Sequence, residues 1–281
     1  MKNRNLFSGN KTKNSSIKYF IISFSVFIVL LAVSSVVLFM HSLDYDISNL
    51  IDSSSTTTTS EAEENITKVS SVNELEGKSN LLFIVEEGEG VDFACVVSTD
   101  FDNKSMTVKC VDGSEDLSYK NKTLMLSSIY SMDFQLGVNT AITENFGITT
   151  DKYIIFNEKQ FEDFLALFNG FTVNVQEEVN YKSHDFNLNL SLGVQQLSPD
   201  MTYKYMKISN NSIRESVICD IIKSVLVADY VDDSEKLFKS FVNLCKTDIS
   251  VIDYSESVDR LSTYCYAQDK FYPTVFNEGD K

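Results

Sequence analysis

The sequence contains no tryptophan, only two prolines and only two histidines. So few prolines, with only ten glycines in 281 residues, exclude collagen-like and proline-rich low-complexity proteins. Two histidines and five cysteines make a zinc site or a histidine-based catalytic triad an unfavoured interpretation. Basic residues are also scarce, at 24 against 40 acidic ones, which gives a formal net charge of −16. Since nucleic-acid-binding proteins need basic patches to neutralise phosphates, we expect no nucleic-acid partner.

Apolar residues, by contrast, are abundant enough to build a folded core. Hydrophobic residues make up 43% of the chain and aromatic residues 12%, which excludes a largely disordered protein. A length of 281 residues suits one large domain or two small ones.

The first 40 residues have the pattern of a membrane anchor. Residues 19–40 form an uncharged stretch of 22 residues, long enough to cross a hydrocarbon core of about 30 Å as a helix. Residues 1–18 carry five basic residues and no acidic one, and the positive-inside rule places such a flank in the cytoplasm. We therefore predict a single-pass cell-membrane protein with a cytoplasmic basic tail (1–18), a transmembrane helix (19–40) and an extracytoplasmic remainder. A cleaved signal peptide is the alternative, but it typically has a shorter apolar stretch and a small-x-small cleavage site.

Residues 41–79 are predicted to form a stalk and residues 80–281 a folded ectodomain. The run SSSTTTTSEAEEN in the stalk is polar and acidic without apolar periodicity, as in solvated linkers. Cysteines outside the membrane can oxidise, and Cys95 and Cys110 fall on consecutive strand-like runs that can face each other across a hairpin. Because five is an odd number, at least one cysteine lacks an intramolecular partner. Small buried apolar side chains are the favoured interpretation for most of them.

Strand-like and helix-like patterns alternate along the predicted ectodomain. Buried or alternating apolar runs predict strands at 80–85, 91–98, 106–111, 153–156, 171–175 and 186–192. Apolar residues at helical spacing predict helices at 134–146, 157–168, from 212 and from 234. Ser198 as N-cap with Pro199 after it predicts a short helix at 199–205, and a last helix is predicted at 257–266. Ser212 and Glu215 have capping-box spacing, which predicts that Ser212 caps a long helix. The mixture indicates an α/β class, with α+β as the alternative, built on a central mixed β-sheet flanked by helices.

Few residues carry an obvious chemical signal. The sequence has no hydrolase elbow, P-loop, dinucleotide fingerprint or paired metal ligands. His184 stands alone in an expected loop. Acidic side chains gather at Glu86, Glu87, Glu89 and Asp92, and such hard oxygen ligands can attract a divalent cation. A solvated loop is the favoured interpretation for the three glutamates.

The order of these elements resembles the ectodomain of LytR–CpsA–Psr (LCP) proteins, which follows a basic N-terminus, one transmembrane helix and a stalk in bacterial cell envelopes. The resemblance runs from Asn80 to Leu244. NLLFIV resembles the family's opening strand, and VDFACVVSTDFDNKSMTVKCV resembles its hairpin. The later segments that match the family pattern in order are GITTDKYIIF, FEDFLALFNG, LSPDMTYKYMKIS and SIRESVICDIIKSVL.

The resemblance implies a protein that transfers a glycopolymer from a polyprenyl-pyrophosphate carrier to peptidoglycan. In the family this chemistry uses several arginines, a carboxylate and a divalent cation, because guanidinium forks neutralise the strongly anionic pyrophosphate. Asp92 matches the family aspartate and would hold the metal, with Mg²⁺ as the cofactor of an active enzyme. Lys207 and Arg214 stand at two of the arginine positions and would bind the pyrophosphate. The structural alternatives are that Asp92 bonds strand-edge backbone and that Arg214 pairs with Glu215 or with an acidic residue of the stalk.

The chain departs from the family pattern at the positions that carry this chemistry. Gly113, Asn157, Lys207, Ser209 and Glu215 stand, in that order, where the family has an arginine, an acid, the two arginines of R-x-R and a glutamine. Lysine is a point charge that cannot reproduce a guanidinium fork. The strand, cap and helix patterns survive while the site does not, so we predict a retained fold with a degenerate active site and assign no catalytic residue.

The leading interpretation is therefore a membrane-anchored LCP-like protein of the bacterial cell envelope with a binding or regulatory role. Its expected partners are the membrane and either a polyprenyl-linked lipid or an active LCP paralogue. The first alternative is an active but divergent phosphotransferase, with Asp92 on the metal and Lys207 and Arg214 on the pyrophosphate. The second is a eukaryotic type II membrane glycoprotein whose ectodomain binds protein, because Asn-x-Ser/Thr sites such as Asn65 and Asn121 are present.

Overall fold

The computed structural model describes residues 71–277. The predicted cytoplasmic tail, the transmembrane helix and most of the stalk lie outside the described residues, as do residues 278–281. Within 71–277, no helix is both long and apolar enough to span a bilayer. The first described elements are the short helix η2 (Val72–Glu74) and strand β1 (Lys78–Glu87), which begin before the expected ectodomain boundary at residue 80.

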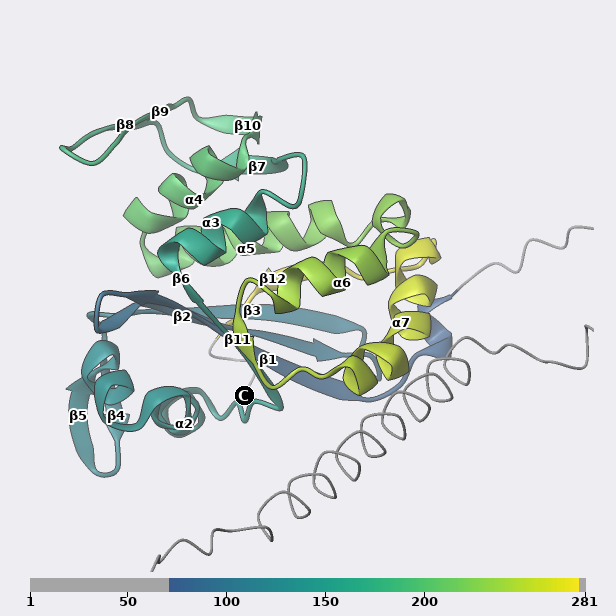
Figure 1. Ribbon diagram of the computed structural model, residues 1–281, viewed down its shortest axis with the longest axis horizontal. Coiled ribbons are helices and arrows are strands. Elements are labelled where there is room, and N and C mark those ends of the chain that lie inside the picture. The colour runs from purple at the N-terminus through teal and green to yellow at the C-terminus, as the bar shows by residue number, and fades with distance from the viewer. Residues whose placement is uncertain (1–70, 278–281) are drawn as a thin grey trace, which may run out of the picture. The chain divides into compact units, whose positions relative to one another are not determined.

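A six-stranded mixed sheet forms the centre of the fold, in the order β11-β6-β1-β2-β3-β12 (Figure 1). Its long strands β1, β2 (Gly90–Asp100) and β3 (Ser105–Asp112) form an antiparallel meander. Strands β6 (Lys152–Asn157) and β12 (Pro273–Val275) add in parallel to β1 and β3, and the short β11 (Lys246–Thr247) runs antiparallel to β6. The predicted strands at 80–85, 91–98, 106–111 and 153–156 are confirmed, whereas β11 and β12 were not foreseen.

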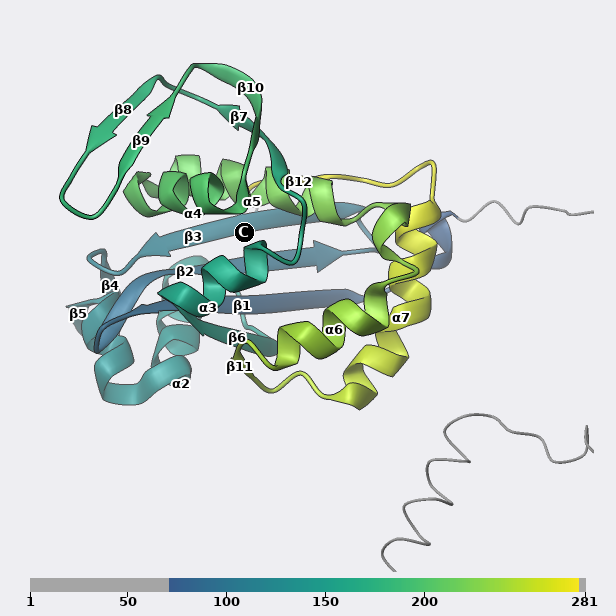
Figure 2. The ribbon, with the colours of Figure 1, turned by 45° about the horizontal axis from the view of Figure 1, so that its top comes forward.

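Helices cover both faces of this sheet (Figures 1 and 2). On one face lie α3 (Glu158–Leu165), α4 (Pro199–Ile208), α5 (Asn211–Val225) and α6 (Ser234–Val242). On the other lies α2 (Leu126–Phe146), which follows the small hairpin of β4 (Asp116–Tyr119) and β5 (Lys122–Met125). The predicted class, a mixed sheet flanked by helices, is confirmed.

Each face of the sheet has its own apolar core. Along β2, Phe93 and Cys95 belong to the core shared with α3, α4 and α5, whereas Ala94 and Val96 belong to the core shared with α2. This alternation follows from the strand geometry, in which successive side chains point to opposite faces. An uninterrupted apolar run such as FACVV (93–97) therefore marks a strand buried on both sides.

A long bent hairpin extends above the helices (Figure 1). Strand β7 (Phe171–Val175) pairs with β10 (Gly193–Leu197), and β8 (Val179–Lys182) pairs with β9 (Asn187–Leu190). The predicted strand at 171–175 is confirmed, and the one predicted at 186–192 contains β9. His184 lies exposed in the turn between β8 and β9, as expected for a loop residue.

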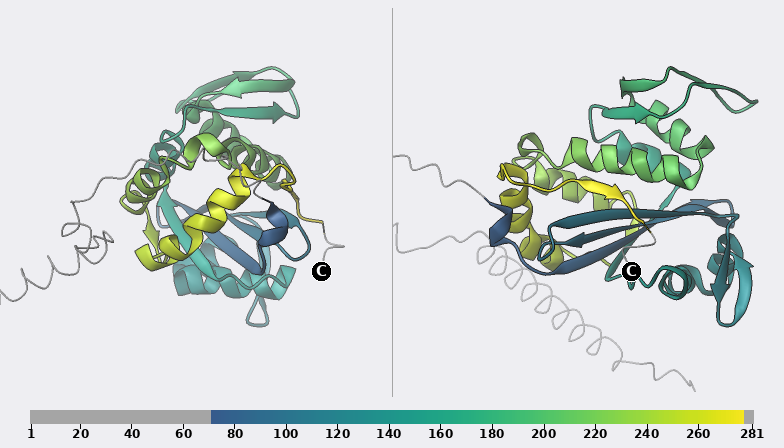
Figure 3. Two further views of the ribbon diagram at one scale, coloured as in Figure 1. Left: turned by 90° about the vertical axis from the view of Figure 1, so that its right-hand side faces the viewer. Right: turned by 180° about the vertical axis from the view of Figure 1, so that it is seen from behind.

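Two helices begin earlier than the sequence predicted. Helix α2 begins at Leu126 rather than at 134, because Phe134 adopts φ 49° and ψ −144° and breaks the helical periodicity in its middle. Helix α7 (Val251–Tyr266) begins six residues before the predicted 257, with Ser250 and Asp253 forming its capping box. Figure 3 shows α7 at one end of the sheet, where it packs with η2 in a third apolar cluster.

The predicted capping box of Ser212 and Glu215 is wrong. The N-cap of α5 is Asn210, whose side chain accepts a hydrogen bond from the backbone N–H of Ile213. Asn210 is one of the residue types that favour this position, so two candidate caps stood two residues apart in the sequence. Glu215 lies inside the helix and its carboxylate accepts a bond from the backbone N–H of Cys110 at 2.9 Å.

The predicted placement of Cys95 opposite Cys110 is confirmed. The two residues are direct cross-strand partners in the β2–β3 register, and their sulfurs form a disulfide. Both side chains are fully buried. Cys219, Cys245 and Cys265 are free thiols, of which Cys219 and Cys265 are buried.

Candidate functional site

The residues singled out from the sequence converge at one end of the sheet. Asp92 lies near the start of β2, just after the β1–β2 turn, Lys207 lies in the last turn of α4, and Arg214 lies in the first turn of α5. Each of these two cations exerts an electrostatic effect on the Asp92 carboxyl, so the three form one group. The fold thus brings together residues up to 122 positions apart in sequence.

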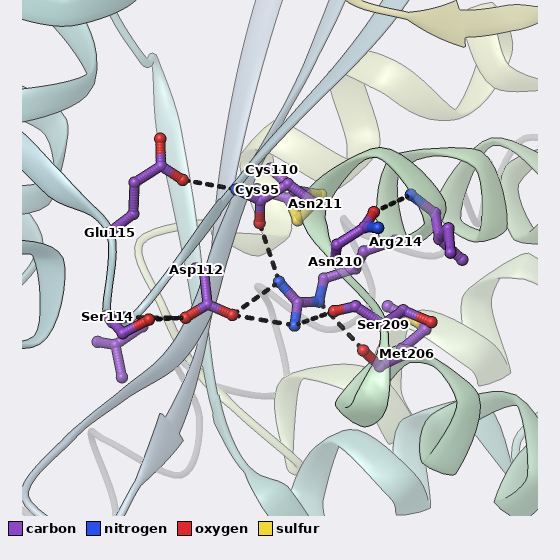
Figure 4. Close-up of polar contacts among 12 residues, drawn as sticks. Cys95, Cys110, Asp112, Ser114, Glu115, Met206, Ser209, Asn210, Asn211 and Arg214 are labelled. Atoms are coloured by element: carbon purple, nitrogen blue, oxygen red, sulfur yellow. Dashed lines mark hydrogen bonds and ion pairs between the residues drawn. A yellow bond between two sulfur atoms is a disulfide. The ribbon is translucent and has the colours of Figure 1, made fainter. Parts of the chain in front are cut away.

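Arg214 is buried, with only 1% of its surface exposed, and its guanidinium is fully engaged (Figure 4). It donates to the carbonyl oxygens of Met206 at 3.2 Å and Ser209 at 3.0 Å, and to the Asn211 side chain at 3.0 Å. The Asp112 carboxylate forms an ion pair with it at 3.3 Å. The guanidinium also lies over the Phe93 ring, 4.5 Å from its centroid. The sequence interpretation that Arg214 pairs with Glu215 is therefore wrong, and Asp112 is its acidic partner.

Lys207 is held by two carboxylates of the chain. Its ammonium lies 3.1 Å from the nearer carboxylate oxygen of Glu87 and also contacts Glu158. Burial alone lowers the pKa of Lys207, but its bonds to Glu158 and Glu87 outweigh burial and raise the pKa. The lysine therefore stays charged, and two carboxylates of the chain, Glu87 and Glu158, already pair with it.

Asp92 carries one of two buried polar atoms of the site that lack a hydrogen-bond partner among residues 71–277, and the other is the Tyr203 hydroxyl. One carboxyl oxygen, Oδ2, is buried without a hydrogen-bond partner among the described residues. Burial raises the pKa of Asp92 to about 6, with the Arg214 charge opposing the shift and the Glu87 charge adding to it. The alternative role as a strand-edge backbone partner receives no support from the bonds of residues 71–277.

We expect Asp92→Asn to stabilise the protein at pH 7 by roughly 1–2 kcal/mol. The folded-state pKa lies above the ordinary 3.8, so the folded protein keeps its proton between about pH 4 and 6 while the unfolded chain loses it. Stability therefore falls as pH rises through this window, and above it the ionised Asp92 carboxylate destabilises the folded protein. Urea unfolding of both proteins at pH 4 and 7 measures the effect; Asp116→Asn, at an exposed aspartate, is the control. An equal stability difference at both pH values would contradict the assignment.

The structure leaves no room at Gly113 for the arginine that the family has at this position. A Cβ atom there would lie 1.7 Å from the carbonyl oxygen of Val91 and 2.8 Å from the hydroxyl oxygen of Ser127. The other departures also have local structural roles. Asn157 caps α3 in a capping box with Gln160, and the Ser209 hydroxyl bonds the Tyr205 carbonyl oxygen at 2.6 Å.

Three further residues of the site were missed from the sequence. Glu158 and Asp112 supply the counter-charges of Lys207 and Arg214. Tyr203 lies in the segment LSPDMTYKYMKIS, and its buried hydroxyl experiences the charges of Glu158, Asp92 and Glu87. Burial raises the pKa of this tyrosine, with Glu158 adding to the shift. The sequence signals that could have identified them are an acidic residue next to Asn157, an acidic residue next to Gly113 and a tyrosine in the segment that carries Lys207.

The donor set does not fit a resident magnesium ion. Among the described residues no group of three or more His, Cys, Asp and Glu side chains is arranged to hold a metal. Glu87 and Asp112 are committed to Lys207 and Arg214, and Glu86 accepts bonds from the Tyr130 hydroxyl and from Lys246. The expected metal role of Asp92 therefore lacks companion ligands, and we derive no step through a metal.

The interior behind the site is filled with aromatic rings. From Tyr203 the rings of Phe161, Phe164 and Phe241 follow one another at centroid distances of 6.1, 6.3 and 6.0 Å. Beyond them lies an apolar hollow of about 240 Å³ between α3, α5, α6 and α7. A row of contacting aromatic rings, one pair stacked and two pairs edge-to-face, thus lies between the polar site and this hollow.

The fold can be compared with solved structures. TagV from Bacillus subtilis has 15% identity and a TM-score of 0.59, over 72% of this chain and 85% of its own. A protein from Enterococcus faecalis described as a transcriptional regulator has 15% identity and a TM-score of 0.56, over 74% of this chain and 79% of its own. TagT bound to LI-WTA has 13% identity and a TM-score of 0.50, over 72% of this chain and 85% of its own. Neither a protein-family model nor a curated protein sequence matches the chain.

These similarities define the class of fold. TagV and TagT are LCP family proteins from B. subtilis, and the matched regions cover most of both chains. This chain therefore has the LCP fold, and the resemblance inferred from its sequence is confirmed at the level of the fold.

Proposed function

We propose that this chain is a membrane-anchored LCP-fold protein of the bacterial cell envelope. Its proposed role in cell-wall glycopolymer metabolism is binding or regulation, and it does not transfer the polymer itself. One observation carries the proposal: both cations of the site are neutralised by the chain's own carboxylates, Lys207 by Glu87 and Glu158, and Arg214 by Asp112.

A pyrophosphate would have to displace these carboxylates. Arg214 is buried and uses its donors on two backbone carbonyl oxygens and on the side chains of Asn211 and Asp112. With Glu87, Asp92, Asp112 and Glu158 present, the site has more acidic than basic groups, and a further anion meets net repulsion. Transfer chemistry requires the reverse arrangement, with unpaired donors aimed at developing negative charge.

The disulfide supports an extracytoplasmic location. Disulfides persist in oxidising compartments and are rare in the cytosol. The Cys95–Cys110 bridge lies in the sheet, downstream of the predicted anchor, as expected when residues 1–18 remain in the cytoplasm.

Calorimetric titration with inorganic pyrophosphate tests the proposal on the full chain in detergent. We expect no saturable heat from the native protein, and binding at least about tenfold tighter in Glu87→Gln/Glu158→Gln, because these changes release Lys207 without altering side-chain size. The matched control is Glu162→Gln/Asp163→Asn, since Lys159 is also paired with two carboxylates, at 3.2 and 2.9 Å, outside the site. Tight binding by the native protein, unchanged in the released variant, would contradict self-neutralisation.

A divergent transferase is the second candidate, favoured by the unpartnered Asp92 oxygen and by the apolar hollow behind the rings. Native mass spectrometry of the detergent-purified chain separates the two, with an active LCP protein as the positive control. Our proposal expects no co-purifying polyprenyl pyrophosphate, because pyrophosphate binding is blocked. A bound carrier would contradict our proposal and favour the divergent transferase.

A further inference from the structure

A second hollow lies on the opposite face of the sheet, away from the candidate site. Its volume is about 810 Å³, within the range of ligand pockets. It occupies the face on which α2 packs, beyond the end of α2 at Phe146. Figure 3 shows β12 beside β3 at the edge of the sheet, next to this region.

The sheet face changes character between adjacent residue rows. Leu82 and Val96 are cross-strand partners, buried in the core beneath α2. Two residues further along each strand, the next row consists of hydrogen-bonding side chains that line the hollow. In strand order this row is Asn80, Ser98, Thr107 and Thr274, each opposite the next across β1, β2, β3 and β12.

The following row closes the hollow with a neutralised pair. Lys78, Asp100 and Ser105 are opposite one another, and the Lys78 ammonium lies 2.7 Å from the Asp100 carboxylate. Ile148 and Phe276 add apolar surface to the lining. The lining therefore contains hydroxyls and amides, two apolar side chains and no unbalanced charge, although the whole chain carries −16.

This chemistry excludes three ligand classes. An anion finds only Lys78, which is already paired. A metal ion finds only Asp100, which accepts bonds from Asn103 as well as from Lys78. A lipid tail would cover the Ser98 and Thr107 hydroxyls without offering them a hydrogen-bond partner, which is costly.

We propose that this hollow binds a neutral glycan. Hydroxyl side chains both donate and accept hydrogen bonds, as sugar hydroxyls do, and the Ser98 and Thr107 hydroxyls make no side-chain hydrogen bond to another residue in 71–277. Neighbouring strands lie about 4.8 Å apart, so Ser98 and Thr107 offer two adjacent partners to a chain lying across the strands. At the two ends of the row, the Asn80 amide already donates to the Thr149 carbonyl oxygen and the Thr274 hydroxyl to that of Met106. The apolar C–H faces of sugar rings have Phe276 and Ile148 as neighbours. The site is independent of Lys207 and Arg214 and does not rest on the proposed function.

Saturation-transfer difference NMR on the full chain tests the proposal, in a detergent whose head group contains no sugar. The probes are the N-acetylglucosamine tetramer and maltotetraose, each at millimolar concentration. We expect saturation of ring protons of at least one probe, and affinity reduced roughly tenfold in Ser98→Ala/Thr107→Val, because two hydrogen bonds are lost. Ser105→Lys, at the exposed rim, should block binding while leaving the buried sheet intact.

The matched control is Ser118→Ala/Thr172→Val, which removes two exposed strand hydroxyls elsewhere. It should bind as the native chain does. No transfer to either probe, or equal transfer in the native and Ser98→Ala/Thr107→Val proteins, would overturn the proposal. Failure here leaves the pyrophosphate experiment unaffected, since that concerns the opposite face.

Discussion

Replacing Arg214 with methionine should lower the free energy of unfolding by about 3–5 kcal/mol. The change keeps an apolar stem of similar length but removes the guanidinium that is 1% exposed. The Ser209 carbonyl oxygen would lose its donor, the Met206 carbonyl oxygen would keep only the Ser209 N–H, and Asp112 would lose its charged partner. Buried acceptors left without donors pay their full desolvation cost. Equilibrium unfolding in urea, followed by circular dichroism, measures the loss.

Lys207→Met is the matched control, because it removes the other cation of the site from a partly exposed position. The Lys207 side chain is 28% exposed, so we expect a loss of less than about 1 kcal/mol. Arg214→Lys should be nearly as damaging as Arg214→Met, since an ammonium cannot reach the same set of acceptors. Equal small losses in all three variants would mean that Arg214 is free for a ligand rather than part of the framework.

The contrast between these two residues explains what the sequence could predict of the site. Motif position alone placed Lys207 and Arg214 in one pyrophosphate site, and the fold does bring both close to Asp92. Motif position did not reveal that the acidic partners of both cations come from other elements, Glu158 from α3 and Asp112 from β3. Such counter-charges depend on tertiary packing, which no local spacing records.

The fold itself was more accessible, because its signals are local. Continuous apolar runs identified the buried strands of the sheet, and the alternation FTVNV matched β7. The short edge strands β11 and β12 were missed because two or three residues carry no period. The start of α2 was missed because Phe134, with φ 49°, splits one apolar stripe into two. The cap of α5 was misplaced because Asn210 and Ser212 are both acceptable caps.

The disulfide offers the second large effect, a loss of about 3 kcal/mol in Cys95→Ala/Cys110→Ala. The bridge joins residues 15 apart, and cross-linking a loop of this length restricts the unfolded chain by about that amount. The control Cys219→Ala/Cys265→Ala also removes two buried sulfurs, but breaks no cross-link. The excess loss in the first variant therefore isolates the bridge from the lost packing.

A reductant supplies the independent measurement. The native protein unfolded without reductant should react with a thiol reagent at three cysteines, and at all five after reduction. Unfolding in excess dithiothreitol should bring the native protein close to the Cys95→Ala/Cys110→Ala variant and leave that variant unchanged. Because both sulfurs are buried in the sheet, a reductant should reach the bridge only after the protein unfolds. Mild reductant without denaturant should therefore leave the bridge intact. Five reactive thiols before reduction would show that the bridge is not formed, and would remove the support it gives to an oxidising compartment.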